Sequence, residues 1–216
     1  MENVWSRPRK APRQTLTLER IVAEAVALLD EEGADRLTMR RLAERLDTGS
    51  TTLYWHVKTK DDVLDLALDA VFGEVRLPGP AGGWQAAVRE LIGGWRAALL
   101  RHPWSATILD RPLMGPNALE RTDFLYRTLI GAGFGAPTAA AYSLSNYVMG
   151  SVVMQVTWQD RDAEDTGAFL RERADRYPAL AEHGLDLDWD ATFDEGLGYL
   201  LAGMEQAGKR DTGRLE

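Results

Sequence analysis

Apolar residues recur along most of the chain at the three- and four-residue spacing of a helix that buries one side. The pattern is clear in residues 18–32, and Gly33 follows directly as a residue that commonly ends helices. It returns in further segments: 38–46, 50–56, 59–75, 84–102, 104–109, 117–130, 137–159, 166–177 and 190–207. No stretch alternates apolar and polar residues as a half-buried strand does. The pattern predicts an all-α protein of about ten helices.

The segment 137–159 differs from the others because it carries no charged residue before Asp160. A helix that is apolar on all sides is unsuited to a solvated surface. We expect it to be buried on most sides, within the subunit, against a second subunit, or both. Together with 190–207, it is the predicted dimer interface, arranged as a four-helix bundle.

The clearest break in the helical pattern is Leu-Pro-Gly-Pro-Ala-Gly-Gly at 77–83. Prolines and glycines this dense do not continue a helix, so we place a domain boundary there. The predicted organisation is a basic flexible arm at 1–14, an N-terminal domain at 15–76, a C-terminal helical domain at 84–207 and a flexible tail at 208–216.

Composition limits the chemistry. The chain has no cysteine, which excludes disulfides and thiolate metal sites and fits a reducing compartment. No apolar run reaches the roughly 18 residues of a membrane span, and the first residues do not resemble a signal peptide. We therefore expect a soluble, cytoplasmic protein with no membrane partner.

The net charge of −8 at first argues against a nucleic-acid partner, but the charge is unevenly distributed. Residues 1–60 carry a net charge of +2 and the remainder −10. The arm holds Arg7, Arg9, Lys10 and Arg13 against Glu2 alone. Such an arm either neutralises phosphates or only solubilises the chain.

Two of the predicted helices, 38–46 and 50–56, are separated only by the turn Asp47-Thr48-Gly49. Ser50 is a favourable N-cap residue, and Leu53 is the expected buried contact of the second helix. The rest of that short helix carries hydroxyl and aromatic side chains. Such a helix suits the major groove of DNA, and the pair is predicted to be a helix-turn-helix.

The motif Leu-Tyr-Trp-His-Val-Lys-Thr-Lys at 53–60 resembles the DNA-binding domain of the TetR family of repressors, and especially the tetracycline repressor branch. The resemblance covers about residues 15–75, including Asp-Glu-Glu-Gly at 30–33 and Leu37-Thr38. The C-terminal part resembles the family in helical character and length, with a loose similarity around His102-Pro103-Trp104. The turn departs from the family, which usually has Gly-Val where this chain has Asp47-Thr48. Asp tolerates the left-handed backbone that such a turn requires.

The resemblance implies a three-helix DNA-binding domain followed by a ligand-binding and dimerisation domain. Arg40 is expected to contact a guanine or a phosphate, and Lys60 a phosphate. Tyr54 and Trp55 could instead pack in the core, and His56 could cap its helix. The predicted DNA-binding residues are Thr38, Arg40, Ser50, Thr51, Thr52, Tyr54, Trp55, His56 and Lys60.

By the same resemblance, the C-terminal domain should hold a small-molecule inducer of aromatic or apolar character. The predicted ligand-binding residues are Trp84, Trp95, His102, Trp104, Tyr126, Asn146, Met149 and Gln155. Tryptophans of this kind more often belong to a core than to a ligand site. A buried amide needs hydrogen-bond partners, and for Asn146 and Gln155 these could lie on another helix or subunit.

The predicted function is that of a homodimeric transcriptional repressor, released from a palindromic operator in double-stranded DNA by its inducer. Two alternatives stay open: a helical enzyme that binds a small molecule, and a DNA-binding dimer without an inducer. We expect no enzyme activity, because no nucleophile and base occur at a recognisable spacing. No cofactor is expected, and His56, His102 and His183 lack the spacing of metal ligands.

Overall fold

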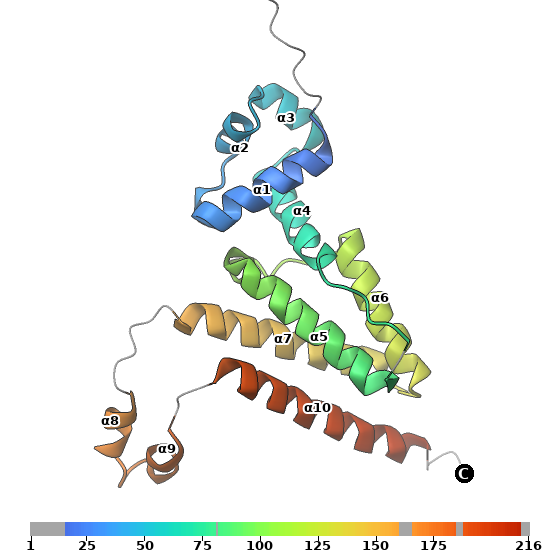
Figure 1. Ribbon diagram of the computed structural model, residues 1–216, viewed down its shortest axis with the longest axis vertical. Helices are drawn as coiled ribbons and strands as arrows, with labels where there is room; N and C mark the ends of the chain where they lie inside the picture. The colour runs from blue at the N-terminus through green and yellow to red at the C-terminus, as the bar shows by residue number, and fades with distance from the viewer. Residues whose placement is uncertain (1–15, 81, 160–165, 185–187, 213–216) are drawn as a thin grey trace, which may run out of the picture. The chain divides into compact units, whose positions relative to one another are not determined.

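The computed structural model describes residues 16–80, 82–159, 166–184 and 188–212. Within these ranges the chain forms helices and no strand, which confirms the all-α prediction (Figure 1). It divides into two compact units, Met1–Ala67 and Leu68–Glu216. The division falls inside helix α4, ahead of the Pro-Gly stretch at 77–83. The predicted basic arm at 1–14 and residues 160–165 lie outside the described residues.

The first unit contains α1 (Leu18–Glu32), the 3-10 helix η2 (Ala34–Arg36), α2 (Met39–Arg45), α3 (Ser50–His56) and the start of α4 (Lys60–Gly73). Threonine hydroxyls cap its first two α-helices: Thr17 accepts from the Arg20 N–H at 3.3 Å, and Thr38 accepts from the Arg41 N–H at 3.2 Å. Gly33 ends α1 as predicted, with a φ of 80° that glycine adopts without strain.

Buried leucine and isoleucine side chains from successive helices form the core of the first unit. Ile21 and Leu28 of α1, Leu42 of α2 and Leu53 of α3 are 0% exposed. Burying each of these side chains stabilises the fold by roughly 1.5–3 kcal/mol. In α3 only Leu53 is buried, so this one residue decides which side of α3 faces the core.

Ion pairs join α2 to α1. Arg45 donates hydrogen bonds to Glu31 and Glu24, and Arg41 donates to Glu32. The hydrogen bond from Arg45 holds the pKa of Glu31 below its usual value, and the two carboxylates raise the pKa of Arg45. Exposed pairs of this kind contribute little stability one by one. Their effect here is to fix the lateral position of α2 on α1.

The second unit continues from the end of α4 with α5 (Gly83–Arg101), the 3-10 helix η3 (Pro103–Thr107), α6 (Pro116–Gly131), α7 (Pro137–Gln159), α8 (Thr166–Arg171), α9 (Pro178–His183) and α10 (Trp189–Thr212). Helices α5, α6 and α7 pack against one another, and α10 packs along α7 (Figure 1). Helices α8 and α9 pack together as a pair.

Three helix predictions differ from the structure. The segment 166–177 is helical only to Arg171, because the residues before Pro178 form turns and Tyr177 is held out of the helical region. The segment 104–109 is the 3-10 helix η3, which starts at Pro103. The last helix continues to Thr212, beyond its predicted end at 207 and into the predicted tail, of which 213–216 lie outside the described residues.

One half-buried arginine links α5 to α7 and α10. The Arg96 guanidinium donates to the Gln155 side-chain oxygen at 2.6 Å and to an Asp190 carboxylate oxygen at 2.7 Å. Close by, the Tyr147 hydroxyl donates to the Phe193 carbonyl at 2.8 Å. These bonds set the distance between α7 and α10.

The end of α4 is joined to the start of α6 by a carboxylate. Asp69 accepts hydrogen bonds from the backbone N–H groups of Asn117 and Ala118, at 3.3 and 2.9 Å, and from the Asn117 amide at 3.0 Å. It therefore caps α6, whose first N–H groups have no partner within the helix. A Cβ on Gly115 would lie only 2.2 Å from this carboxylate, so this approach requires glycine.

The reverse contact runs from α6 to the end of α4. Arg121 is 8% exposed and donates to the carbonyls of Val75, at 2.9 and 3.1 Å, and Gly73, at 3.1 Å. These are carbonyls that the end of a helix leaves without partners. Asp69 and Arg121 thus cap each other's helices, and we call this pair of contacts the α4–α6 joint.

We predict that Arg121→Met will lower the free energy of unfolding by roughly 1–3 kcal/mol, because the buried carbonyl of Val75 and the partly buried carbonyl of Gly73 lose their donor. Denaturant unfolding at fixed protein concentration measures this. The matched control is Arg76→Met, which changes an exposed arginine next to the joint and should shift the midpoint little. Equal midpoints for the two variants would contradict the assigned role.

Candidate nucleic-acid interface and ligand cavity

The turn between α2 and α3 depends on a left-handed residue. Asp47 has a φ of 49°, the only positive φ outside glycine among the described residues. The Asp47 and Thr48 N–H groups donate to the carbonyls of Glu44 and Ala43, at 3.1 and 3.0 Å. Asp47 thus provides the backbone shape that the turn needs, although this pair of residues departs from the usual family sequence.

Helix α3 begins one residue earlier than its predicted cap implied. Its N-cap is Gly49, in an extended conformation, and Ser50 is already the first helical residue. The prediction of Ser50 as N-cap was wrong, because Gly49 reaches the required backbone angles directly after the turn. The side chains of Ser50, Thr51 and Thr52 are all exposed on the first turn.

The aromatic residues of α3 point away from the core. Trp55 is 78% exposed and Tyr54 is 43% exposed, so neither follows the alternative of core packing. His56 is the exposed last residue of the helix. With Leu53 buried beneath them, these side chains form an outward surface of hydroxyls, a phenol, an indole and an imidazole.

Lys58 was missed as a residue of this surface. Its ammonium donates to the Tyr54 carbonyl at 2.8 Å and lies 6.0 Å from the centre of the Trp55 ring. The lysine therefore caps α3 and steadies Trp55 by a cation–π contact. The signal in the sequence was its position four residues after Tyr54.

The start of α4 is fixed by a reciprocal cap. The Thr59 hydroxyl accepts from the Asp62 N–H at 3.0 Å, and the Asp62 carboxylate accepts from the N–H groups of Lys58, at 2.8 Å, and Thr59, at 3.0 Å. This reciprocal arrangement is a capping box. The hydrogen bonds from Lys58 and then Thr59 lower the pKa of Asp62 from its usual value.

Three predicted DNA-binding residues already have partners in the protein. Lys60 is half-buried and donates to the Ala34 carbonyl at 2.8 Å, so its ammonium ties η2 to α4. The Thr38 hydroxyl caps α2. Arg40 is paired with Glu44 at 2.9 Å, but with a side chain 87% exposed it can exchange this partner at little cost.

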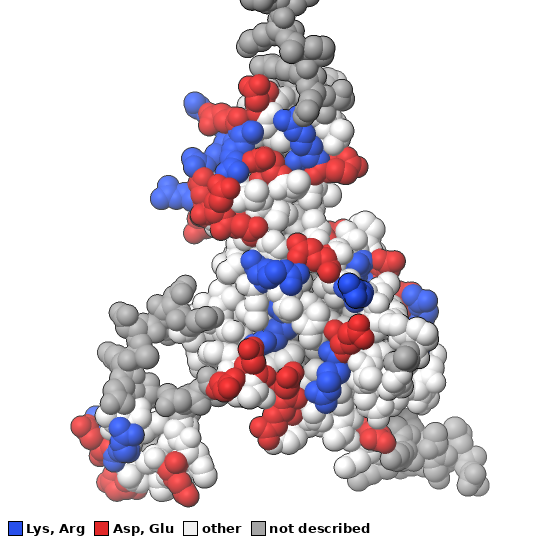
Figure 2. All heavy atoms as spheres, in the orientation of Figure 1, with Lys and Arg blue, Asp and Glu red and all other residues white. Residues whose placement is uncertain are grey.

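The first unit does not present one basic patch on the face drawn in Figure 2. Lysine and arginine side chains alternate there with aspartate and glutamate. This follows from the ion pairs of Arg41 and Arg45 described above. The positive charge of residues 1–60 is therefore largely balanced locally within the described part of the unit.

Four of the predicted ligand-binding residues are buried in the second unit: Trp95, His102, Trp104 and Gln155. The Trp95 ring meets Phe72 edge-on, with 5.7 Å between ring centres. Its indole Nε1 is buried and has no hydrogen-bond partner among the described residues. A buried donor without an acceptor is uncommon in folded proteins.

His102 belongs to a small charged group at the end of α5. Its Nε2 lies 2.9 Å from Glu74, and Arg101 donates to the same carboxyl group. Burial pushes the pKa of Glu74 upward, but the hydrogen bonds from Arg101 and His102 outweigh it and the pKa lies below its usual value.

Gln155 and the other predicted ligand-binding residues are spread over the unit. The Gln155 amide is used inside the subunit by Arg96, as the alternative of an interhelical bond proposed. Asn146 is exposed on α7, and Tyr126 and Met149 are half-buried. Trp84 is the one predicted residue that lines the cavity found in this unit.

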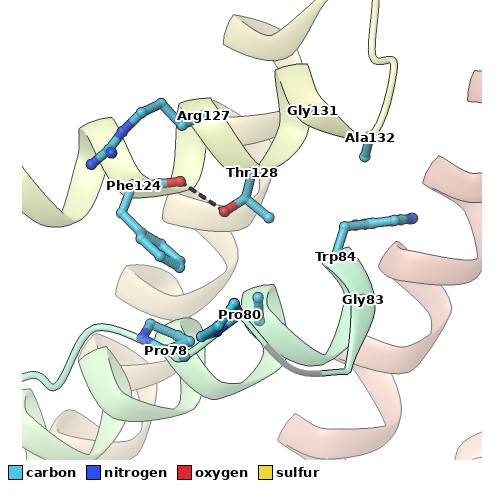
Figure 3. A pocket seen from close by; sticks show the side chains of 11 residues that line it. Pro78, Pro80, Gly83, Trp84, Phe124, Arg127, Thr128, Gly131 and Ala132 are labelled. Carbon is cyan, nitrogen blue, oxygen red and sulfur yellow. Dashed lines mark hydrogen bonds between the residues drawn. The ribbon is translucent and has the colours of Figure 1, made fainter.

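This cavity has a volume of about 580 Å³ and lies between the start of α5, its preceding connection and the last turns of α6. It is lined by Pro78, Gly79, Pro80, Gly83, Trp84, Ala87, Phe124, Arg127, Thr128, Gly131 and Ala132. Figure 3 shows Phe124 and Thr128 directed towards the prolines. The sequence analysis interpreted residues 77–83 only as a domain boundary. The prolines of this segment were the sequence feature that could have indicated a rigid wall of a cavity.

The described residues contain no group of three or more His, Cys, Asp or Glu side chains arranged to hold a metal ion. None of their helices is long and apolar enough to cross a membrane.

Two family models match the chain: "Bacterial regulatory proteins, tetR family" over residues 21–67 and "Tetracyclin repressor-like, C-terminal domain" over residues 78–207. An HTH-type transcriptional regulator of Saccharopolyspora erythraea is 49% identical over 213 residues, covering 93% of this chain and 90% of that protein. The Escherichia coli tetracycline repressor protein class C is 30% identical over 201 residues, covering 88% of this chain and 91% of that protein.

Similar proteins with more specific names come from Streptomyces. The HTH-type transcriptional repressor DrrR1 of Streptomyces coeruleorubidus is 32% identical over 228 residues, covering 95% of this chain and 84% of that protein. The crystal structure of the Streptomyces coelicolor TetR family protein ActR in complex with actinorhodin matches with a TM-score of 0.82 and 32% identity. The match covers 90% of this chain and 99% of that chain.

We predict that Asp62→Ala will lower the melting temperature at pH 7, and that the difference from the wild type will shrink below about pH 4. The folded state lowers the pKa of Asp62 from 3.8, so its stabilising effect is present above that pH and is lost as the pH falls through the folded pKa. Circular dichroism melts across pH measure this. The control Asp35→Ala removes an exposed carboxylate of η2, and a similar pH dependence for it would contradict the assignment.

Proposed function

Because this chain belongs to the TetR family of bacterial regulatory proteins, we propose that it acts as a homodimeric repressor of a palindromic operator. As a member of this family it is a ligand-responsive, DNA-binding transcriptional regulator. The finer proposal concerns how it binds, assembles and responds. We further propose that it carries no enzyme activity and works in the cytoplasm, where operator DNA is found.

The observation that carries the proposal is the outward surface of α3. Leu53 is fully buried and anchors the helix, while Thr52, Tyr54 and Trp55 are exposed on its other sides. A short helix held in this way can enter the major groove with its side chains directed at base edges and phosphates. We assign DNA contact to the predicted DNA-binding residues. Lys60, at the start of α4, is assigned to a phosphate and not to a base.

Arg40 is the candidate for direct base recognition. An arginine makes two hydrogen bonds to guanine O6 and N7, a stronger contact than its exposed pair with Glu44. The exchange of Glu44 for a base or phosphate on DNA binding is therefore favourable.

Assembly into a dimer follows from the need for specificity, because one short helix reads few base pairs. Two such helices about 34–36 Å apart address successive major grooves of a palindrome. The exposed faces of α7 and α10 carry the large apolar side chains Val153, Met154, Trp158 and Tyr199. We propose that these faces form the dimer interface and that Asn146, exposed on α7, hydrogen-bonds within it.

The inducer is proposed to reach the buried indole of Trp95. That Nε1 lacks an acceptor among the described residues, so a ligand oxygen placed there would satisfy it. ActR, a structural relative, has been crystallised with actinorhodin, which supports a small-molecule inducer for this chain. Such a ligand releases DNA only if it binds the DNA-incompetent state more tightly, through a shift of α4.

We predict that Tyr54→Ala and Arg40→Ala will each weaken specific operator binding by about 1–3 kcal/mol. Fluorescence anisotropy at fixed salt, with a palindrome selected in vitro from random DNA, measures the affinity. Helicity and dimerisation should be unchanged. The control Arg89→Ala removes an exposed arginine of α5 and should bind as the wild type does. Wild-type affinity in both Tyr54→Ala and Arg40→Ala would refute the assigned contacts.

We predict that Met154→Glu combined with Trp158→Glu will convert the dimer to a monomer at micromolar concentration, because unpaired carboxylates would be buried in the interface. Sedimentation velocity distinguishes the two states. Ile130→Glu places a carboxylate on an equally exposed apolar site of α6 and should leave the dimer intact. A dimeric double variant would show that α7 lies outside the interface.

A further inference from the structure

We propose that the cavity between the 78–80 connection and the last turns of α6 is a second small-molecule site, separate from the surroundings of Trp95. We infer that its ligand is a flat, uncharged and largely apolar molecule. The proposal concerns binding alone and stands whether or not the proposed operator recognition is correct.

Two of the lining residues are glycines with open space beside them. A Cβ added to Gly79 or Gly131 would meet no atom within 4 Å, so the space next to both backbones is open. The cavity volume of about 580 Å³ falls within the range of small-molecule sites, roughly 300–1,000 Å³. The cavity is therefore large enough for two or three fused rings.

The chemistry of the walls selects against charge. The lining includes the apolar side chains of Phe124, Trp84 and two prolines. The Thr128 hydroxyl already donates to the Phe124 carbonyl at 2.8 Å (Figure 3). Figure 3 shows the Arg127 guanidinium directed away from the other lining residues, and its Nε is paired with Asp123 at 2.7 Å. A charged ligand group placed inside would lose water without gaining a partner.

The walls are also held in place before any ligand arrives. Pro78 and Pro80 restrict the connection, since each fixes its own φ. Trp84 is braced by an edge-on contact with Phe134, with 5.0 Å between ring centres. A site that is already ordered loses less conformational entropy when it binds.

Position separates this cavity from the Trp95 site. Its α5 residues are Gly83, Trp84 and Ala87, which belong to the first turns of that helix. Trp95 lies further along α5 and packs on Phe72 of α4. Neither of these two residues lines the cavity.

The test uses N-phenyl-1-naphthylamine, an uncharged probe that fluoresces when bound in apolar surroundings, titrated into the full-length protein. Gly131→Leu should weaken binding by roughly tenfold or more, because it fills the cavity. Gly131 is helical and its added Cβ meets open space, so the variant should fold. Phe124→Ala should weaken binding severalfold by removing a wall. The matched control Ala97→Leu adds the same side chain to an exposed position of α5 and should bind as the wild type does.

Four results bear on the proposal directly. Wild-type probe affinity in Gly131→Leu, with a normal circular dichroism spectrum, would overturn it, as would a probe that does not bind the wild type. Weaker binding in Trp95→Phe but not in Gly131→Leu would place the probe at the inducer site and also overturn it. The sulfonated analogue 8-anilinonaphthalene-1-sulfonate tests the ligand class: equal or tighter binding, lost in Gly131→Leu, would refute the inferred preference for an uncharged molecule. Operator affinity, measured without probe, tests the proposed function independently.

Discussion

The buried guanidinium of Arg121 is the contact on which the second unit depends most. It donates hydrogen bonds to carbonyls at the end of α4 that no helical N–H can reach. In the opposite direction, the Asp69 carboxylate accepts a hydrogen bond from a backbone N–H group at the start of α6. A buried charge of this kind tolerates little displacement, because each lost bond leaves a desolvated group behind. The position of α6 relative to the end of α4 is therefore fixed. Residues 78–80 of the connection then lie close to α6, and the cavity lies between them.

The first unit holds a very short helix, α3, in one orientation. Helix α3 contains a single buried side chain, Leu53, and this would be a weak anchor on its own. The left-handed Asp47 before it and the Thr59–Asp62 cap after it fix both ends of the segment. The exposed aromatic residues can therefore be positioned without being packed, which leaves them available to a partner.

Most of the local structure could be predicted from the sequence, because helix caps and one-sided apolar spacing act over a few residues. Gly33, Thr38 and Thr59 each signal a helix end within one turn. The contacts that escaped prediction join residues far apart in the chain, such as Lys60 with Ala34 and Arg96 with Gln155. Nothing in the sequence near Arg121 distinguishes it from a surface arginine. The cavity was missed for the same reason, since its walls come from separate segments. The assigned DNA and ligand contacts stay predictions.

The ion pairs of the first unit have a consequence for the ionic-strength dependence of binding. A cation that contacts a phosphate normally displaces condensed counterions from DNA, and the entropy gained makes affinity fall steeply with added salt. Arg40 must first part from Glu44, and the released carboxylate then takes up cations from solution. The cations taken up by the Glu44 carboxylate offset the counterions released from DNA. The affinity for DNA should therefore depend on salt concentration less steeply than the number of arginines near α3 predicts. Operator binding should weaken less between dilute and physiological buffers than the positive charge alone implies.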